Sequence, residues 1–99
     1  MKSFLTEKLY ELGFACGIEL ESYIQDTGKY TSLIIEGEQK EGEITYYYDF
    51  YKQTFYLHSP NKITVYGENM TAVQLLGRVE SYLCHRQQYL TELSNKIKT

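Results

Sequence analysis

The chain has 99 residues, of which 42% are hydrophobic and 23% are charged, the composition of an ordinary globular protein. This length and composition exclude a disordered chain and leave room for one domain, which we expect to span residues 1–99. The net charge of −3 combines −6 over residues 1–50 with +3 over residues 51–99, and this balance argues against general nucleic-acid binding, which needs a basic footprint.

The sequence predicts neither a secretion signal nor a membrane span. Charged residues recur every few positions near the N-terminus, and a run of about 18 apolar residues occurs nowhere. We therefore expect a cytoplasmic protein that makes no membrane contact. Its two cysteines, Cys16 and Cys84, are expected to be reduced thiols.

The N-terminal segment predicts a short helix over residues 3–12, with Ser3 as its N-cap. Apolar residues recur at helical spacing, at Leu5, Leu9 and Leu12. Gly13 then stands where a left-handed C-terminal cap is favoured, and Phe14 is placed for the apolar contact that accompanies such a cap.

Alternation with a period of two predicts two strands, over residues 18–25 and 30–36, joined by a hairpin turn. In the first strand the even-numbered apolar residues are expected to face the core. Glu19, Glu21 and Tyr23 would then share the opposite face.

A polar hairpin loop is expected over residues 37–42, followed by a strand over residues 43–51 that is rich in aromatic residues. One face of this strand would carry Ile44, Tyr46, Tyr48 and Phe50, and the other Thr45, Tyr47, Asp49 and Tyr51. A tight connection near residues 52–53 would lead to a strand over residues 54–58. A turn containing Pro60 would lead to the last strand, over residues 63–66.

The rest of the chain predicts one long helix that starts near Asn69 or Met70, with an apolar stripe that only Arg86 interrupts. About 28 helical residues would span roughly 40 Å, so we expect the distal part to extend beyond the sheet. A coiled-coil seam with a second copy would cover its apolar residues, and the alternative is a bend near Arg86 that returns the helix end to the first helix. The residues of this predicted homodimer seam are Leu90, Leu93 and Ile97.

These elements predict an α+β fold in the order α-β-β-β-β-β-α. It is a five-stranded antiparallel meander with a short N-terminal helix and a long C-terminal helix packed on one face. The strands are consecutive along the chain, and the long helix is the last element.

The sequence contains no recognisable catalytic, metal or cofactor motif. Cys84 and His85 are neighbours, but adjacent residues on a helix point in different directions. Together with Cys16 and His58 they also lack the local spacing of metal ligands. We therefore predict no cofactor, no metal and no catalysis. A small enzyme or ligand-binding domain that uses Cys84, His58 or a tyrosine hydroxyl is the alternative.

Tyrosine is unusually frequent, with 11 residues and no tryptophan. Tyrosine forms strands well, so sheet packing is one explanation. The other is a protein interface on the sheet face that the helices leave uncovered, because interfaces are enriched in such rings. The residues predicted for this acidic, tyrosine-rich interface are Glu19, Glu21, Tyr23, Glu38, Glu41, Tyr47, Asp49 and Tyr51.

The sequence thus predicts a small non-catalytic protein-binding or regulatory module whose partner has a basic surface. A sharper alternative is an inhibitor of a nucleic-acid-binding host protein, encoded by a phage or mobile element, which occupies a basic groove as anti-CRISPR proteins do. Direct binding of nucleic acid is not expected, since acids rather than bases accompany the tyrosines.

Overall fold

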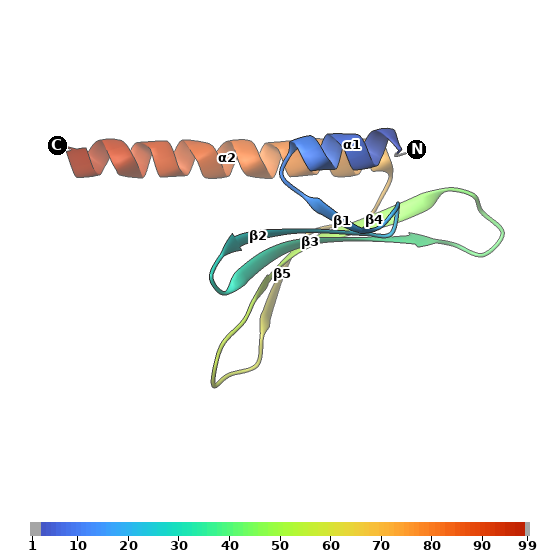
Figure 1. The fold of residues 1–99 in the computed structure, drawn as a ribbon, viewed down its shortest axis with the longest axis horizontal. Helices are drawn as coiled ribbons and strands as arrows, with labels where there is room; N and C mark the ends of the chain where they lie inside the picture. Colours follow the sequence, from blue (N-terminus) through green and yellow to red (C-terminus); the bar gives the residue numbers. More distant parts are fainter. Residues whose placement is uncertain (1–2, 99) are drawn as a thin grey trace.

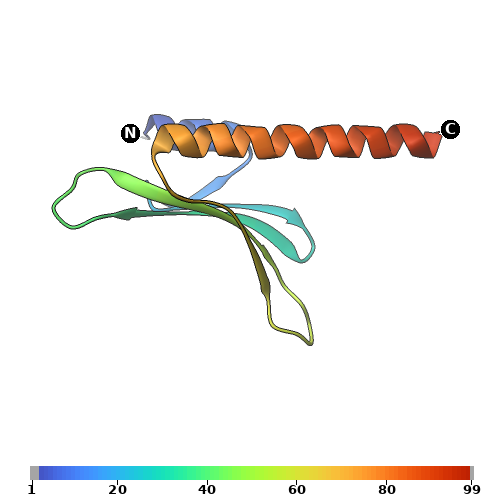
Figure 2. The ribbon, with the colours of Figure 1, turned by 180° about the vertical axis from the view of Figure 1, so that it is seen from behind.

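The computed structural model describes the backbone of residues 3–98 and the side chains of residues 3–87. Its elements are α1 (Phe4–Glu11), β1 (Ala15–Ile18), β2 (Ser22–Gly28), β3 (Thr31–Gln39), β4 (Tyr46–Thr54), β5 (Lys62–Met70) and α2 (Ala72–Lys98). The strands form one antiparallel sheet in the order β1-β2-β3-β4-β5, and both helices lie on one face of it (Figure 1 and Figure 2). The predicted α+β meander with two terminal helices is confirmed.

The residues around α1 are those that begin and end helices. The Thr6 N–H donates to the Ser3 hydroxyl at 3.1 Å, which caps the N-terminus. At the other end Gly13 has a φ of 98°, and the Phe14 N–H donates to the Leu9 carbonyl at 2.8 Å. The predicted glycine cap is confirmed, and Phe14 is buried as expected.

The start of α2 differs from the prediction. Thr71 and Gln74 form a capping box: the Gln74 N–H donates to the Thr71 hydroxyl at 3.3 Å, and the Thr71 N–H donates to Gln74 Oε1 at 3.0 Å. A start near Asn69 or Met70 was wrong because these residues still belong to β5. Asn69 has a φ of 52°, and Met70 pairs with Tyr48 of β4.

The core lies between the helices and the sheet, and aromatic rings fill much of it. The ring of Phe50 contacts Phe14, Tyr66 and Tyr82, with centroids 6.4, 5.3 and 5.8 Å away. Tyr48 is buried as well. Packing in the sheet and the core, the first of the two explanations given for the many tyrosines, therefore accounts for a large part of them.

The strand boundaries differ from the prediction at several places. β3 extends to Gln39 and β4 begins only at Tyr46, so Ile44, predicted to share a face with Tyr48 and Phe50, lies in the loop and is 91% exposed. Two further errors cancel in the strand count. The segment 18–25 is not one strand, because the chain turns after β1 at Leu20, which has a φ of 67°. The tight connection near residues 52–53 does not form, because β4 continues in register with β3 as far as Thr54. Residues 54–58 are consequently no separate strand, and the chain crosses to β5 through residues 55–61.

The extra turn also changes which side chains of β2 face the core. Tyr23 pairs with Ile35 on the helix-covered face and is only 1% exposed, whereas Ile24 is 44% exposed on the other face. The expectation that Tyr23 shares an exposed face with Glu19 and Glu21 was therefore wrong. Because the chain turns between β1 and β2 and does not form one strand over residues 18–25, the alternation of faces starts again at the beginning of β2.

The helix α2 is continuous over 27 residues and extends past the end of the sheet (Figure 1). Arg86, which interrupts the apolar stripe, lies where the helix passes the sheet end, and its Nη2 donates to the Thr27 carbonyl at 3.0 Å. The helix does not break at Arg86. The side chains of the predicted seam, Leu90, Leu93 and Ile97, lie outside the described residues. Over the described residues, neither helix has both the length and the apolar character needed to cross a membrane.

Candidate functional site

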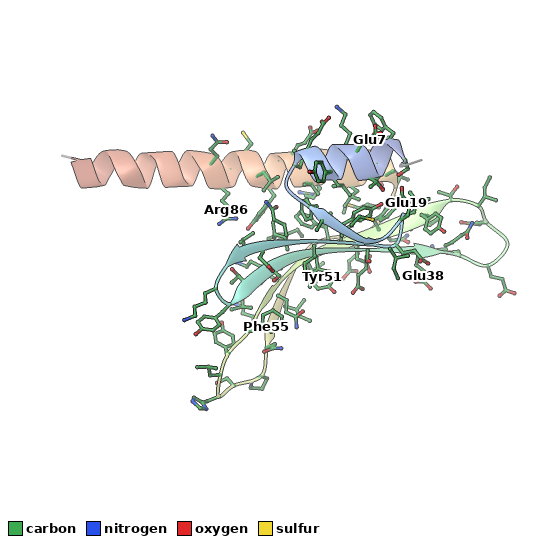
Figure 3. All side chains as sticks on the ribbon, viewed as in Figure 1. Glu7, Glu19, Glu38, Tyr51, Phe55 and Arg86 are labelled. Atoms are coloured by element: carbon green, nitrogen blue, oxygen red, sulfur yellow. The ribbon has the colours of Figure 1, made fainter. Side chains whose placement is uncertain are left out.

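The face of the sheet that turns away from the helices, here called the open face, is not covered by any other described part of the chain (Figure 1). Along β4 the exposed Asp49 and the half-buried Tyr47 and Tyr51 lie on this face, and they alternate with the buried Tyr48 and Phe50. The faces predicted for these five residues are confirmed. The side chain of Tyr51 projects from the sheet on the side opposite the helices (Figure 3).

An apolar row crosses the open face from strand to strand. Pairing between neighbouring strands aligns Ile24 of β2 with Ile34 of β3, Ile34 with Tyr51 of β4, and Tyr51 with Val65 of β5. Ile24 is 44% exposed and Val65 is 49% exposed. Aligned, half-exposed apolar side chains with polar neighbours are typical of protein contact surfaces.

Beside the apolar row the open face is hollowed, and the lining of this acidic hollow is rich in carboxylates. Its volume is about 690 Å³. The carboxylates are those of Glu21, Glu36, Glu38, Asp49 and Glu68, and Lys40 is the one basic residue of the lining. The ion pair that the described residues form, Lys8–Glu11, lies on α1, so these carboxylates carry charge that no described base neutralises by direct contact.

Hydrogen bonds hold two of the carboxylates in place. The Tyr51 hydroxyl donates to Glu36 Oε1 at 2.6 Å, and the Asn69 N–H donates to Asp49 Oδ1 at 2.9 Å. Burial raises the pKa of Tyr51 to about 12, and the bonded Glu36 carboxylate adds to the shift. The hydroxyl is protonated at neutral pH, as in an ordinary tyrosine, and the raised pKa keeps it a donor into the alkaline range.

Glu21 lines the acidic hollow because a buried hydroxyl network fixes the turn between β1 and β2. The Tyr23 hydroxyl accepts a bond from the Leu20 N–H at 2.9 Å and is bonded to the Thr6 hydroxyl of α1 at 2.8 Å. Burial raises the pKa of Tyr23. The Gly37 N–H donates to the Glu21 carbonyl at 2.7 Å, so the turn is attached to β3 as well.

The structure brings together most, but not all, of the predicted interface residues. Glu21, Glu38, Tyr47 and Asp49 line the acidic hollow, and Tyr51 lies next to them. Three others lie elsewhere. The predicted residues outside the open face are Tyr23 in the core, Glu19, whose carboxylate accepts bonds from Ser3 and Thr6, and Glu41 in the exposed loop between β3 and β4.

Sequence reasoning missed Glu36, Glu68 and the apolar row. Glu36 was the last residue of a strand predicted to end there, and strand alternation alone would have placed it on one face with Ile34 and Glu38. Glu68 lay outside the predicted strand 63–66, since nothing in the local sequence indicates that β5 continues to Met70.

The thiols and imidazoles do not converge on a common site. Cys84 and His85 lie exposed on α2, where His85 Nδ1 bonds to the Ser81 carbonyl at 2.9 Å. His58 lies in the loop between β4 and β5. This loop extends from the sheet on the side away from α2 (Figure 2). Over the described residues, no three His, Cys, Asp or Glu side chains are arranged to hold a metal ion. The alternative of an enzyme built on these groups gains no support from their positions.

Comparison with known proteins gives no family for this chain. No protein-family model matches it, and neither a curated protein nor a solved structure does. Any inference about function therefore depends on the residues of the open face.

Proposed function

We propose that the chain is a non-catalytic protein-binding module that binds a partner on its open face. The observation that carries this proposal is the apolar row lying directly beside the acidic hollow. A partner that fits would bury apolar side chains against the row and place lysines or arginines over the hollow. Burial would supply most of the binding free energy, and the charges would set orientation and association rate.

The dimensions and rigidity of the open face support this role. Neighbouring strands lie about 4.8 Å apart, so a row that crosses four strands is about 14 Å long, enough for a few anchoring side chains. The Tyr51 ring and the Glu36 carboxylate are already tied together, and less side-chain entropy is lost when prearranged groups become ordered on binding. Lys40 Nζ lies 4.6 Å from the centre of the Tyr47 ring, so this ring is held too.

The excess of carboxylates favours one class of partner in particular, a protein with a basic groove that binds nucleic acid. Five carboxylates against one lysine in the hollow give a concentrated negative charge, although the whole chain carries only −3. A chain that fills such a groove would act as an inhibitor of the host protein, as a phage or mobile element would encode. In this version the partner cannot bind the chain and nucleic acid together.

Capture of partners from the cells in which the chain is naturally made tests the proposal. The test variant combines Glu38→Lys with Glu68→Lys, because both carboxylates are exposed and neither is bonded to a described residue. The matched control combines Glu7→Lys with Glu80→Lys, an equal change of charge on the helices, and Glu7 lies on the outer side of α1 (Figure 3).

We expect a directly bound protein to be lost by the test variant and kept by the control. Equal capture by both variants would contradict the proposal. Addition of nucleic acid then tests the inhibitor version: release of the captured partner is expected if the two compete for one groove, and undiminished capture would exclude this version.

A further inference from the structure

The hairpin of β4 and β5 bends away from the helices and ends in exposed apolar side chains, on a segment here called the tip, residues 55–61 (Figure 1). Phe55, Tyr56 and Leu57 are 42%, 49% and 80% exposed. With Tyr30 they line a shallow, mostly apolar depression of about 290 Å³. The Phe55 N–H donates to the Tyr30 carbonyl at 2.7 Å, so the turn between β2 and β3 adjoins the tip.

The charge around the tip is positive. Residues 55–67 contain no aspartate or glutamate, and they include Lys62, with His58 at the tip itself. Lys52 lies on the helix-covered face, paired with the buried Leu33, and does not belong to this charge. The adjoining turn adds Lys29, whose Nζ lies 5.4 Å from the centre of the Tyr30 ring, and the carboxylate near this turn, Asp26, accepts a hydrogen bond from the Ser32 hydroxyl. The tip thus combines exposed apolar groups with positive charge, whereas the open face combines them with negative charge.

We infer that the tip of one copy of this chain binds the open face of a second copy. The inference rests on the proposed function, because it takes the open face to be a protein-binding surface and names a second copy as an occupant. The two surfaces are complementary twice over: Leu57 and its aromatic neighbours can be buried against the apolar row, and Lys62 can lie near the carboxylates of the acidic hollow.

This contact is head-to-tail, since the tip and the open face are different surfaces of the chain. Each copy has one tip and one open face, so copies can add one after another and form either a closed ring or an open filament. A partner with a basic surface would compete with the tip for the open face. Self-association would therefore cover the open face until such a partner binds.

Sedimentation of the full chain tests the inference. For the wild type, up to about 1 mM protein, we expect the average mass to rise with concentration and to fall when salt screens the charges. The tip variant combines Leu57→Glu with Lys62→Glu, both at exposed positions, and the face variant is Glu38→Lys with Glu68→Lys. Each should raise the dissociation constant by at least about tenfold, the loss expected when a large apolar group or a complementary charge is removed from a contact.

Mixing the two variants gives the decisive measurement. The tip variant keeps an intact open face and the face variant keeps an intact tip, so an equimolar mixture should form a one-to-one dimer that neither forms alone. Val73→Glu is the matched control, since Val73 is 81% exposed on α2 and its replacement should leave association at the wild-type level.

A wild type that stays monomeric, or a mixture that does not dimerise, would overturn the inference. Association that the tip variant does not weaken would also overturn it, because the contact would then lie elsewhere, for example on α2. The proposed function is tested separately. It is supported if the face variant loses a protein captured from cells, whether or not the chain self-associates.

Discussion

The hydroxyl of Tyr51 donates a 2.6 Å hydrogen bond to the Glu36 carboxylate from the neighbouring strand. Tyr51 pairs directly with Ile34, so Glu36 lies diagonally across β3 and β4, within reach of the ring. The bond joins the apolar row to the acidic hollow, because its donor belongs to the row and its acceptor to the hollow. Both parts of the proposed binding surface therefore share one fixed contact.

The titration of Tyr51 tests this contact. Burial and the bonded carboxylate should keep the hydroxyl protonated until about pH 12, which the ring resonances in an NMR titration will report. Glu36→Gln removes the negative charge and should lower the pKa of Tyr51, although burial still raises it. A Tyr51 that titrates near its ordinary value of about 10 in the folded wild type would contradict the contact.

The free energy of unfolding is expected to fall at alkaline pH. Burial raises the pKa of Tyr48 to about 12, and it raises the pKa values of Tyr23 and Tyr82 as well. In the unfolded chain these groups lose protons near pH 10 while the folded chain keeps them. The stabilisation is therefore complete below about pH 10 and is lost as pH rises toward about 12.

Urea unfolding at a series of pH values measures this loss. One pKa unit corresponds to about 1.4 kcal/mol, so Tyr48 alone should account for roughly 2–3 kcal/mol. Tyr48→Phe should show a weaker dependence on pH over the same range. Unfolding midpoints that do not change between about pH 9 and pH 11 would contradict the expectation.

The hydroxyl of Tyr23 is expected to matter for stability because it is buried and fully used. Tyr23→Phe leaves the Leu20 N–H without its acceptor and the Thr6 hydroxyl with one partner fewer. The free energy of unfolding should fall by about 1–3 kcal/mol, measured by urea denaturation. Tyr47→Phe is the control, and it should change stability by less than about 0.5 kcal/mol because its hydroxyl is bonded to no described residue. Equal effects of the two changes would show that the network does not hold the turn.

Sequence patterns predicted the elements whose signals are local. Gly13 with Phe14 marked the end of α1, and strict alternation over six residues of β4 assigned both of its faces. Each of these signals depends on residues that are neighbours in the chain, so no long-range contact was needed to read it. Thr71 and Gln74 gave an equally local signal for the start of α2, which the prediction did not use.

The turn between β1 and β2 could not be predicted in this way. Leu20 adopts a φ of 67°, which a branched apolar residue rarely does without support from elsewhere. That support comes from Tyr23, Thr6 and Gly37, on three other elements. The contact made by Arg86 could not be predicted either, because its partner is a carbonyl 59 residues earlier in the chain. The candidate site depends on both kinds of information. Strand alternation decides which residues of β4 lie on the open face, whereas the turn between β1 and β2 places Glu21 in the lining of the acidic hollow.

Two glycines should respond in opposite ways to alanine, and the difference tests how the turn is held against β3. A Cβ at Gly37 would overlap the Leu20 carbonyl and the ring of Tyr48, so the turn or the ring must move. Gly37→Ala should lower the free energy of unfolding by about 1–3 kcal/mol. Gly77 lies inside α2, and apart from the helix's own neighbouring backbone no atom lies within 4 Å of an added Cβ, so Gly77→Ala should raise the free energy of unfolding by about 0.5–1 kcal/mol. Both values come from urea denaturation, and a neutral Gly37→Ala would mean that the turn does not lie against β3 as the structure has it.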